Sequence, residues 1–116
     1  MDPAFGGAVR DRLAPLTTET PGLELVVMFG SAARGRTHSQ SDLDVAVLSD
    51  GVSDLDALYL ALAPKLESAR LDLVDLRRAG PILAFEIARS GLLLFERSPG
   101  SFRRFQSLAS RRYADT

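Results

Sequence analysis

The chain has 116 residues, 46% of them hydrophobic and 25% charged, and these proportions predict a single globular domain over residues 1–116. A formal net charge of −1 argues against nucleic acid as the main ligand. The lack of cysteine excludes disulfide frameworks, thiolate catalysis and cysteine-based zinc sites. No apolar run approaches the roughly 20 residues of a membrane span, and the first residues lack a signal-peptide core, so we expect a cytoplasmic protein without a membrane partner.

Apolar spacing and turn-forming residues predict nine elements, which alternate between helix and strand and begin with a helix. In chain order they cover residues 5–14, 23–29, 32–36, 42–48, 55–69, 70–76, 81–90, 92–96 and 99–113. The turn formers at 17–22 predict a connector, and Pro15 ends or kinks the first helix. This order predicts an α/β (α+β) domain with a small mixed sheet of about four strands flanked by helices.

Several helices carry sequence signals at their ends or on their buried faces. Ser31 is expected to N-cap the short helix, Ser53 or Asp54 the next one, and Gly91 suits the position after a helix. Pro64 weakens the middle of helix 55–69, whose predicted buried face consists of Leu55, Leu58, Leu62 and Leu66. Helix 81–90 offers for burial Ile82, Phe85, Ile87 and Ala88.

The segment 99–113 predicts a C-terminal amphipathic helix. Basic and apolar side chains interleave in and just before it: Arg97, Arg103, Arg104, Arg111 and Arg112 with Phe102, Phe105 and Leu108. The favoured interpretation is a helix that packs on its own domain. The alternative is a helix that docks a partner or makes a weak RNA contact.

Two acidic residues on one predicted strand, Asp42 and Asp44, are the first candidates for chemistry. Successive side chains of a strand alternate between faces, so these two carboxylates project from the same face. They repel each other unless a cation or protons intervene, and oxygen ligands favour Mg²⁺. The alternative is structural: Asp42 caps a turn and Asp44 is a solvated residue at a strand edge.

The turn before this strand offers a second candidate site. Gly30 and Ser31 follow an apolar strand and begin a helix, an arrangement in which backbone N–H groups bind phosphate, and Arg34 or Arg36 adds positive charge. An ordinary strand-to-helix turn is the structural alternative. A P-loop is disfavoured, because Arg36 stands where that loop needs lysine and an acidic strand follows instead of a long helix.

Taken together, Gly30-Ser31-x-x-Arg34-Gly35 followed by Ser41-Asp42-x-Asp44 resembles the signature of the nucleotidyltransferase fold of the DNA polymerase β superfamily. The motif is most similar to that of the minimal nucleotidyltransferases of prokaryotes, and the resemblance extends over about residues 23–96. The resemblance implies an enzyme that transfers a nucleoside monophosphate, AMP from ATP being the expected case, to a hydroxyl acceptor.

The resemblance also implies roles for individual residues. Asp42, Asp44 and a third carboxylate would hold two Mg²⁺ ions, while Gly30 and Ser31 would contact the β- and γ-phosphates. Among the less central candidates, Arg34 would touch phosphate or brace the carboxylates, and Ser41 would orient the loop before the aspartates.

The third carboxylate has two candidates on the third predicted strand. Asp72 and Asp75 are three residues apart, so they face opposite sides of a regular strand. Asp72 matches the family pattern and is the favoured ligand. Asp75 is expected to end the strand or cap the following turn.

The size of the chain bears on its partner. The resemblance covers a catalytic domain and leaves no room for one that selects the acceptor, so we expect a partner protein or a second copy to select it. Stand-alone minimal members pair with HEPN-domain ribonuclease toxins and act as antitoxins, by transfer of AMP to a tyrosine or by complex formation. The leading hypothesis is therefore an adenylyltransferase antitoxin. The alternatives are a non-catalytic, partner-binding antitoxin and nucleotidyl transfer to a small molecule or RNA, and a homo-oligomer is left open.

Overall fold

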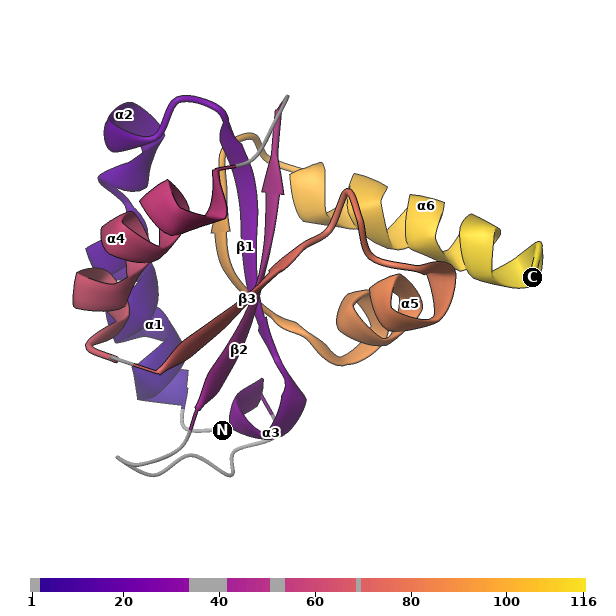
Figure 1. Ribbon diagram of the computed structural model, residues 1–116, viewed down its shortest axis with the longest axis horizontal. Coiled ribbons are helices and arrows are strands. Elements are labelled where there is room, and N and C mark those ends of the chain that lie inside the picture. The colour runs from indigo at the N-terminus through magenta and orange to yellow at the C-terminus, as the bar shows by residue number, and fades with distance from the viewer. Residues whose placement is uncertain (1–2, 34–41, 51–53, 69) are drawn as a thin grey trace.

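Helices cover both faces of one four-stranded sheet in the computed structural model, which describes residues 3–33, 42–50, 54–68 and 70–116 (Figure 1). The strands are β1 (Leu23–Phe29), β2 (Leu43–Ser49), β3 (Leu71–Asp75) and β4 (Leu92–Glu96). The helices are α1 (Pro3–Leu13), α2 (Leu16–Glu19), α3 (Gly30–Ala33), α4 (Leu55–Leu66), α5 (Pro81–Ser90) and α6 (Ser101–Ala114). The predicted α/β class with a small mixed sheet of about four strands is confirmed.

The order of strands in the sheet determines which ends meet. The order is β3-β2-β1-β4, with β1 antiparallel to both of its neighbours and β2 parallel to β3. The end of β1 therefore lies beside the starts of β2, β3 and β4. The chain passes through α3 at this edge (Figure 1), which we call the α3 edge of the sheet.

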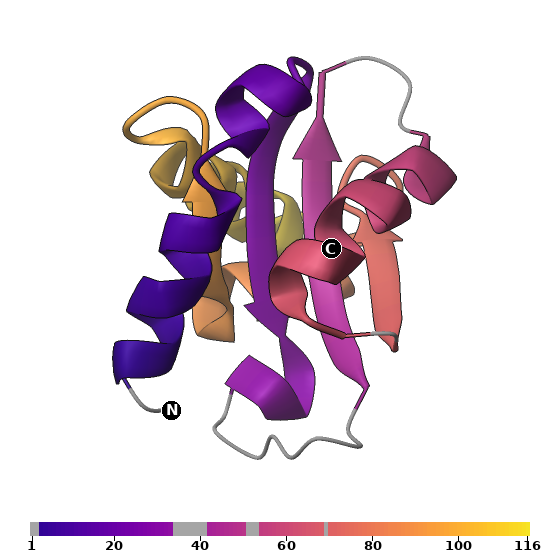
Figure 2. The same cartoon turned by 90° about the vertical axis from the view of Figure 1, so that its left-hand side faces the viewer.

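Each face of the sheet has its own apolar core. Helices α1 and α4 lie on one face, in front of the sheet in Figure 2, and α5 and α6 lie on the other. Val9 and Leu13 of α1 are fully buried on the first face, as are the predicted leucines of α4, with Leu55 only partly buried. Alternation along β2 sends Val45 and Val47 into this core and Ala46 into the core under α5.

The helices differ from the prediction in three places beyond shifts of one or two residues at other ends. Helix α3 begins at Gly30, so Ser31 lies inside it and is not its N-cap. The predicted connector 17–22 overlaps α2, an unpredicted single turn that begins one residue earlier and places Leu16 in the first core with no exposed surface. Helix α4 ends at Leu66, because Glu67 adopts a left-handed backbone (φ 53°) and the Ser68 N–H donates to Ala63 O at 3.2 Å. Asp54 is its N-cap and accepts from the Ala57 N–H at 3.1 Å, whereas Ser53 lies outside the described residues.

Helix α5 has the predicted bounds, but Ile82 within it and Gly91 just after it differ from the expectation. Gly91 has an extended backbone (φ −73°), so it is not needed for a left-handed turn; a Cβ there would meet Ile87 O and the Val27 side chain. Ile82 is 67% exposed, and Ala84 takes the buried position with Ile87 and Ala88.

Arg97 is half-buried, and its guanidinium makes internal contacts with backbone carbonyls. Its guanidinium donates to Leu23 O at 2.8 Å, Thr17 O at 2.9 Å and Thr20 O at 2.7 Å. These three carbonyls belong to α2, the turn after it and the first residue of β1. One side chain after β4 thus secures the segment that leads into β1.

Replacing Arg97 with Ala is expected to lower the free energy of unfolding by about 2–4 kcal/mol, since a hydrogen bond to a charged group contributes about 1.5–3 kcal/mol and the part-buried carbonyls of Leu23 and Thr20 lose their donor. Urea unfolding measures the change. Arg103→Ala is the matched control, because Arg103 is exposed on α6; its effect should stay within about 0.5 kcal/mol. Equal effects of the two substitutions would contradict the role given to Arg97.

Candidate active site

The chain turns sharply at Gly30, where β1 ends and α3 begins. Gly30 has φ 73°, a left-handed backbone that costs other residues roughly 1–2 kcal/mol. A Cβ at this position would also collide with the Asp44 carboxylate. Glycine therefore serves twice, since it permits the turn and lets the carboxylate lie against the backbone.

Asp44 and Asp72 lie side by side at the α3 edge. In the sheet register Asp44 is the partner of Phe29 on β1 and of Asp72 on β3. Residues paired in register project from the same face, so the two carboxylates share the face that carries α5 and α6. The register therefore brings together residues that are 28 positions apart in the sequence.

Asp42 completes a group of three acidic residues around Asp44. It lies just before β2 and is exposed, and its carboxylate is 4.0 Å from the Arg70 guanidinium. Burial raises the pKa of Asp44 above its ordinary value of 3.8, and the negative charges of Asp72 and Asp42 raise it further. The group thus holds unfavourable negative charge, which a bound cation would relieve.

Asp75 lies outside this group. Its register partner is Val47, on the opposite face from Asp44, and its side chain is only 10% exposed. The Arg77 N–H donates to its carboxylate at 3.0 Å, and the Arg78 guanidinium is 3.9 Å away. Asp75 therefore ends β3 and caps the following turn, as expected.

Arg34, Ser41 and the side chain of Ser31 lie outside the described residues. Within the described part of the chain, no three His, Asp or Glu side chains are close enough together to hold a metal ion. Carboxylate oxygens are nevertheless the ligands that Mg²⁺ prefers, so the donor set fits this ion even though the side chains shown do not converge on it.

Arg70 is a residue near the site that the sequence analysis did not single out. Its carbonyl accepts from the Leu43 N–H at 2.9 Å, which continues the pairing of β2 with β3 toward Asp42. The sequence contains a spacing that matches this contact. Arg70 precedes Asp72 by two residues, just as Asp42 precedes Asp44. Only the parallel register shows that these two pairs are neighbours.

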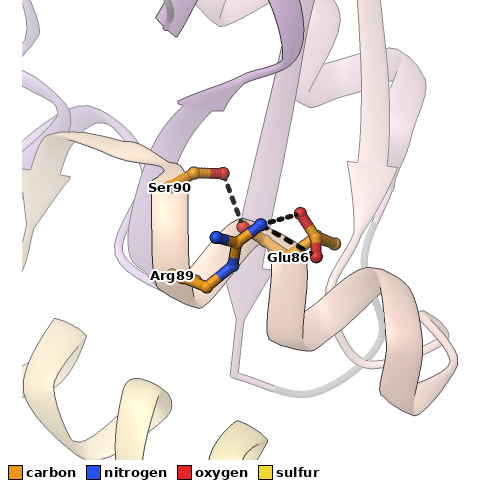
Figure 3. Close-up of polar contacts among 3 residues, drawn as sticks. All are labelled: Glu86, Arg89 and Ser90. Atoms are coloured by element: carbon orange, nitrogen blue, oxygen red, sulfur yellow. Dashed lines mark hydrogen bonds and ion pairs between the residues drawn. The ribbon is translucent and has the colours of Figure 1, made fainter.

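An ion pair at the end of α5 lies at the α3 edge of the sheet. Strand β4 follows α5 directly, and its first residue, Leu92, pairs with Met28, two residues before Gly30. Arg89 donates to both carboxylate oxygens of Glu86, at 2.9 and 3.1 Å, and the Ser90 hydroxyl donates to Glu86 O (Figure 3). Both charged side chains are more than half exposed, so the pair contributes only about 0–1 kcal/mol to stability.

Asp44→Asn is expected to raise the melting temperature at neutral pH without Mg²⁺. An acid whose pKa is raised by folding destabilises the fold where it is ionised, and this cost disappears when it is protonated in both states. The gain should therefore shrink as the pH falls from neutrality to below 3.8. Thermal melts at several pH values measure it, with the exposed Asp11→Asn as control. A gain of equal size at every pH would contradict this account.

Comparison with known proteins agrees with the geometry. The family model described as "Polymerase beta, Nucleotidyltransferase" matches residues 11–100, which include the predicted motif core. A relative named protein adenylyltransferase MntA from Aphanizomenon flos-aquae is 31% identical over 112 residues, 84% of this chain and 73% of its own. Another of that name from Shewanella oneidensis is 40% identical over 83 residues, 69% of this chain and 59% of its own, so the chain spans less than two thirds of that relative.

Solved structures show the same fold. A structure described as a toxin-antitoxin with AMP-PNP has a TM-score of 0.71 and 29% identity, and the match covers 95% of this chain and 87% of that one. Another contains a tri-AMPylated Shewanella oneidensis HEPN toxin with its MNT antitoxin and has a TM-score of 0.68, 27% identity and the same coverage. The chain therefore belongs to the polymerase β nucleotidyltransferase family and is similar to the MntA protein adenylyltransferases within it.

Proposed function

We propose that this chain transfers AMP from ATP to a hydroxyl of a HEPN-domain toxin, most specifically a tyrosine hydroxyl, and acts as its antitoxin. One observation carries the proposal: Asp44 lies against the Gly30 turn and beside Asp72, in a member of a nucleotidyltransferase family. The relatives support a protein acceptor, since they are named protein adenylyltransferases and one solved complex holds an AMPylated HEPN toxin; the tyrosine hydroxyl is the expectation from the family resemblance.

The residues divide the work of binding. Asp42, Asp44 and Asp72 would hold two Mg²⁺ ions, and this group would supply neutralisation of the triphosphate charge and activation of the acceptor hydroxyl. The Gly30 turn leaves room for phosphate oxygens close to the backbone, and Ser31 would donate to the β- and γ-phosphates. Arg34 and Ser41 would support the triphosphate and the loop that carries Asp42.

The transfer needs no covalent enzyme intermediate. The acceptor oxygen forms a bond to the α-phosphorus, the bond from that phosphorus to the β-phosphate oxygen breaks, and pyrophosphate leaves. The acceptor proton passes to solvent or to a carboxylate of the site. The chain contributes positioning and charge neutralisation, which supply most of the rate enhancement in phosphoryl transfer.

The test is incubation of the chain with Mg²⁺, labelled ATP and the product of the neighbouring gene, which we expect to be a HEPN-domain toxin. Label in the α-phosphate should appear on the toxin, and label in the γ-phosphate should not. Mass spectrometry then locates the modified residue. An intact complex that never acquires α-label would refute transfer and leave antitoxin action by binding alone.

Among the described residues, none of the helices combines the length and the apolar composition that a membrane-spanning helix needs.

A further inference from the structure

A groove lies between α6 and the sheet, with a cavity volume of about 460 Å³. Its apolar lining includes Leu76 from the turn after β3 and Phe105 and Leu108 from α6. Leu108 is 51% exposed, whereas Phe105 is buried and stacks on Phe102 at 6.3 Å between ring centroids. The groove is therefore large and apolar enough to accept a few side chains of another molecule.

This groove is separate from the acidic group. It is lined by Glu24 at the start of β1 and Leu48 near the end of β2, and both lie at the sheet edge opposite the α3 edge. Leu48 is four residues beyond Asp44 on the same strand face, a distance of roughly 13 Å at 3.3 Å per residue. A molecule in the groove would thus leave the acidic group free.

Positive charge surrounds the apolar lining. Arg77, Arg104 and Arg112 line the groove from two elements, against the single carboxylate of Glu24. Arg104 donates to the Ser101 hydroxyl at 3.1 Å and Arg112 to Ala79 O at 3.2 Å, so neither of these contacts neutralises a guanidinium. The groove therefore combines apolar surface with the positive charges of Arg104 and Arg112, which these contacts hold in place.

We propose that this groove binds an acidic segment of a partner protein, with an apolar side chain of that segment inserted beside Leu108. Carboxylates of the segment pair with Arg104 and Arg112. A second copy of this chain is a poor occupant through the same helix, because α6 has no acidic residue and two such helices repel. The inference rests on the proposed function in one respect, namely that the partner is the protein that accepts AMP.

The experiment uses isotope-labelled chain and a 12-residue peptide of alternating Leu and Glu, followed by NMR chemical-shift titration. We expect saturable shifts grouped at Leu76, Phe105 and Leu108. A peptide of alternating Leu and Lys should produce none of them, since it would meet like charge. Shifts that are absent, or equal for both peptides, would overturn the proposal.

Paired variants separate the groove from general electrostatics. Arg104→Glu with Arg112→Glu should weaken peptide binding at least tenfold, whereas Arg103→Glu with Arg111→Glu, exposed positions of α6 outside the groove, should change it less than twofold. Equal losses would contradict a specific site. Leu108→Glu, compared with Leu60→Glu at a 74% exposed position of α4, repeats the test without altering an arginine.

Two further measurements distinguish an acidic protein segment from other occupants of the groove, and distinguish failure of this proposal from failure of the proposed function. If a 12-nucleotide RNA binds the same residues more tightly than the peptide does, RNA is the occupant and the proposal is overturned. A dimer of this chain that Leu108→Glu dissociates would overturn it as well, because a second copy would then occupy the groove. With the toxin as ligand, the Arg104 and Arg112 variant should lose complex formation, whereas active-site variants should retain it. If the complex depends on the groove but AMP is never transferred, the proposed function alone fails.

Discussion

Replacing Asp42 and Asp44 together with Asn is expected to lower AMP transfer by roughly a thousandfold or more while the protein remains folded. A divalent cation contributes several kcal/mol of charge stabilisation to the transition state, and each 1.4 kcal/mol is tenfold in rate. Both residues lie in the acidic group in which burial, and then the charges of Asp72 and Asp42, raise the pKa of Asp44. The two amides remove that charge and the preferred ligands of Mg²⁺ together.

The measurement is the rate of α-label incorporation into the toxin at saturating ATP. Asp11→Asn with Asp56→Asn makes the same change in net charge at two exposed helix positions and should leave the rate unchanged. Toxin neutralisation at matched expression is a separate readout. If the Asp42 and Asp44 variant neutralises the toxin as well as the original chain does, binding rather than transfer is responsible.

Asp72→Ala is expected to lower the rate of transfer and Asp75→Ala to lower stability, although the two residues are three apart on one strand. Asp72→Ala should lower transfer at least about a hundredfold, since it removes a carboxylate beside Asp44, and should leave stability unchanged or slightly higher. Asp75→Ala should lower the free energy of unfolding by about 1–2 kcal/mol, because the Arg77 N–H loses its acceptor, with transfer unchanged.

Transfer rates and urea unfolding of both variants provide the comparison, and each variant is the control for the other. Loss of transfer in the Asp75 variant with full activity in the Asp72 variant would reverse the assignment of the third carboxylate. A loss of stability in both would indicate that neither residue is reserved for chemistry.

The secondary structure was largely predictable, because it depends on local patterns. The apolar run of β1 and the leucine spacing of α4 each determine an element without reference to the rest of the chain. The errors arose where tertiary contacts override local preference. Leu16 folds into a turn of helix because the core accepts it, and Ile82 stays exposed because α5 turns Ala84 toward the sheet.

Arg97 and the α6 groove show the same limit for surface residues. A run of arginines in sequence indicates only a basic segment. In the structure these arginines have different roles. Arg97 donates to three backbone carbonyls, whereas Arg104 and Arg112 line an apolar groove. These roles depend on segments far away in the chain, such as residues 17–23 for Arg97.

The candidate site divides in the same way. The sequence by itself determined that a glycine turn precedes the strand of Asp44; it also predicted Asp42 on that strand, whereas Asp42 lies just before β2. Only the tertiary structure decided that Asp72 and not Asp75 lies beside Asp44, because strand register is a contact between distant segments. It also placed the Asp44 carboxylate against Gly30, where burial and two neighbouring charges raise its pKa.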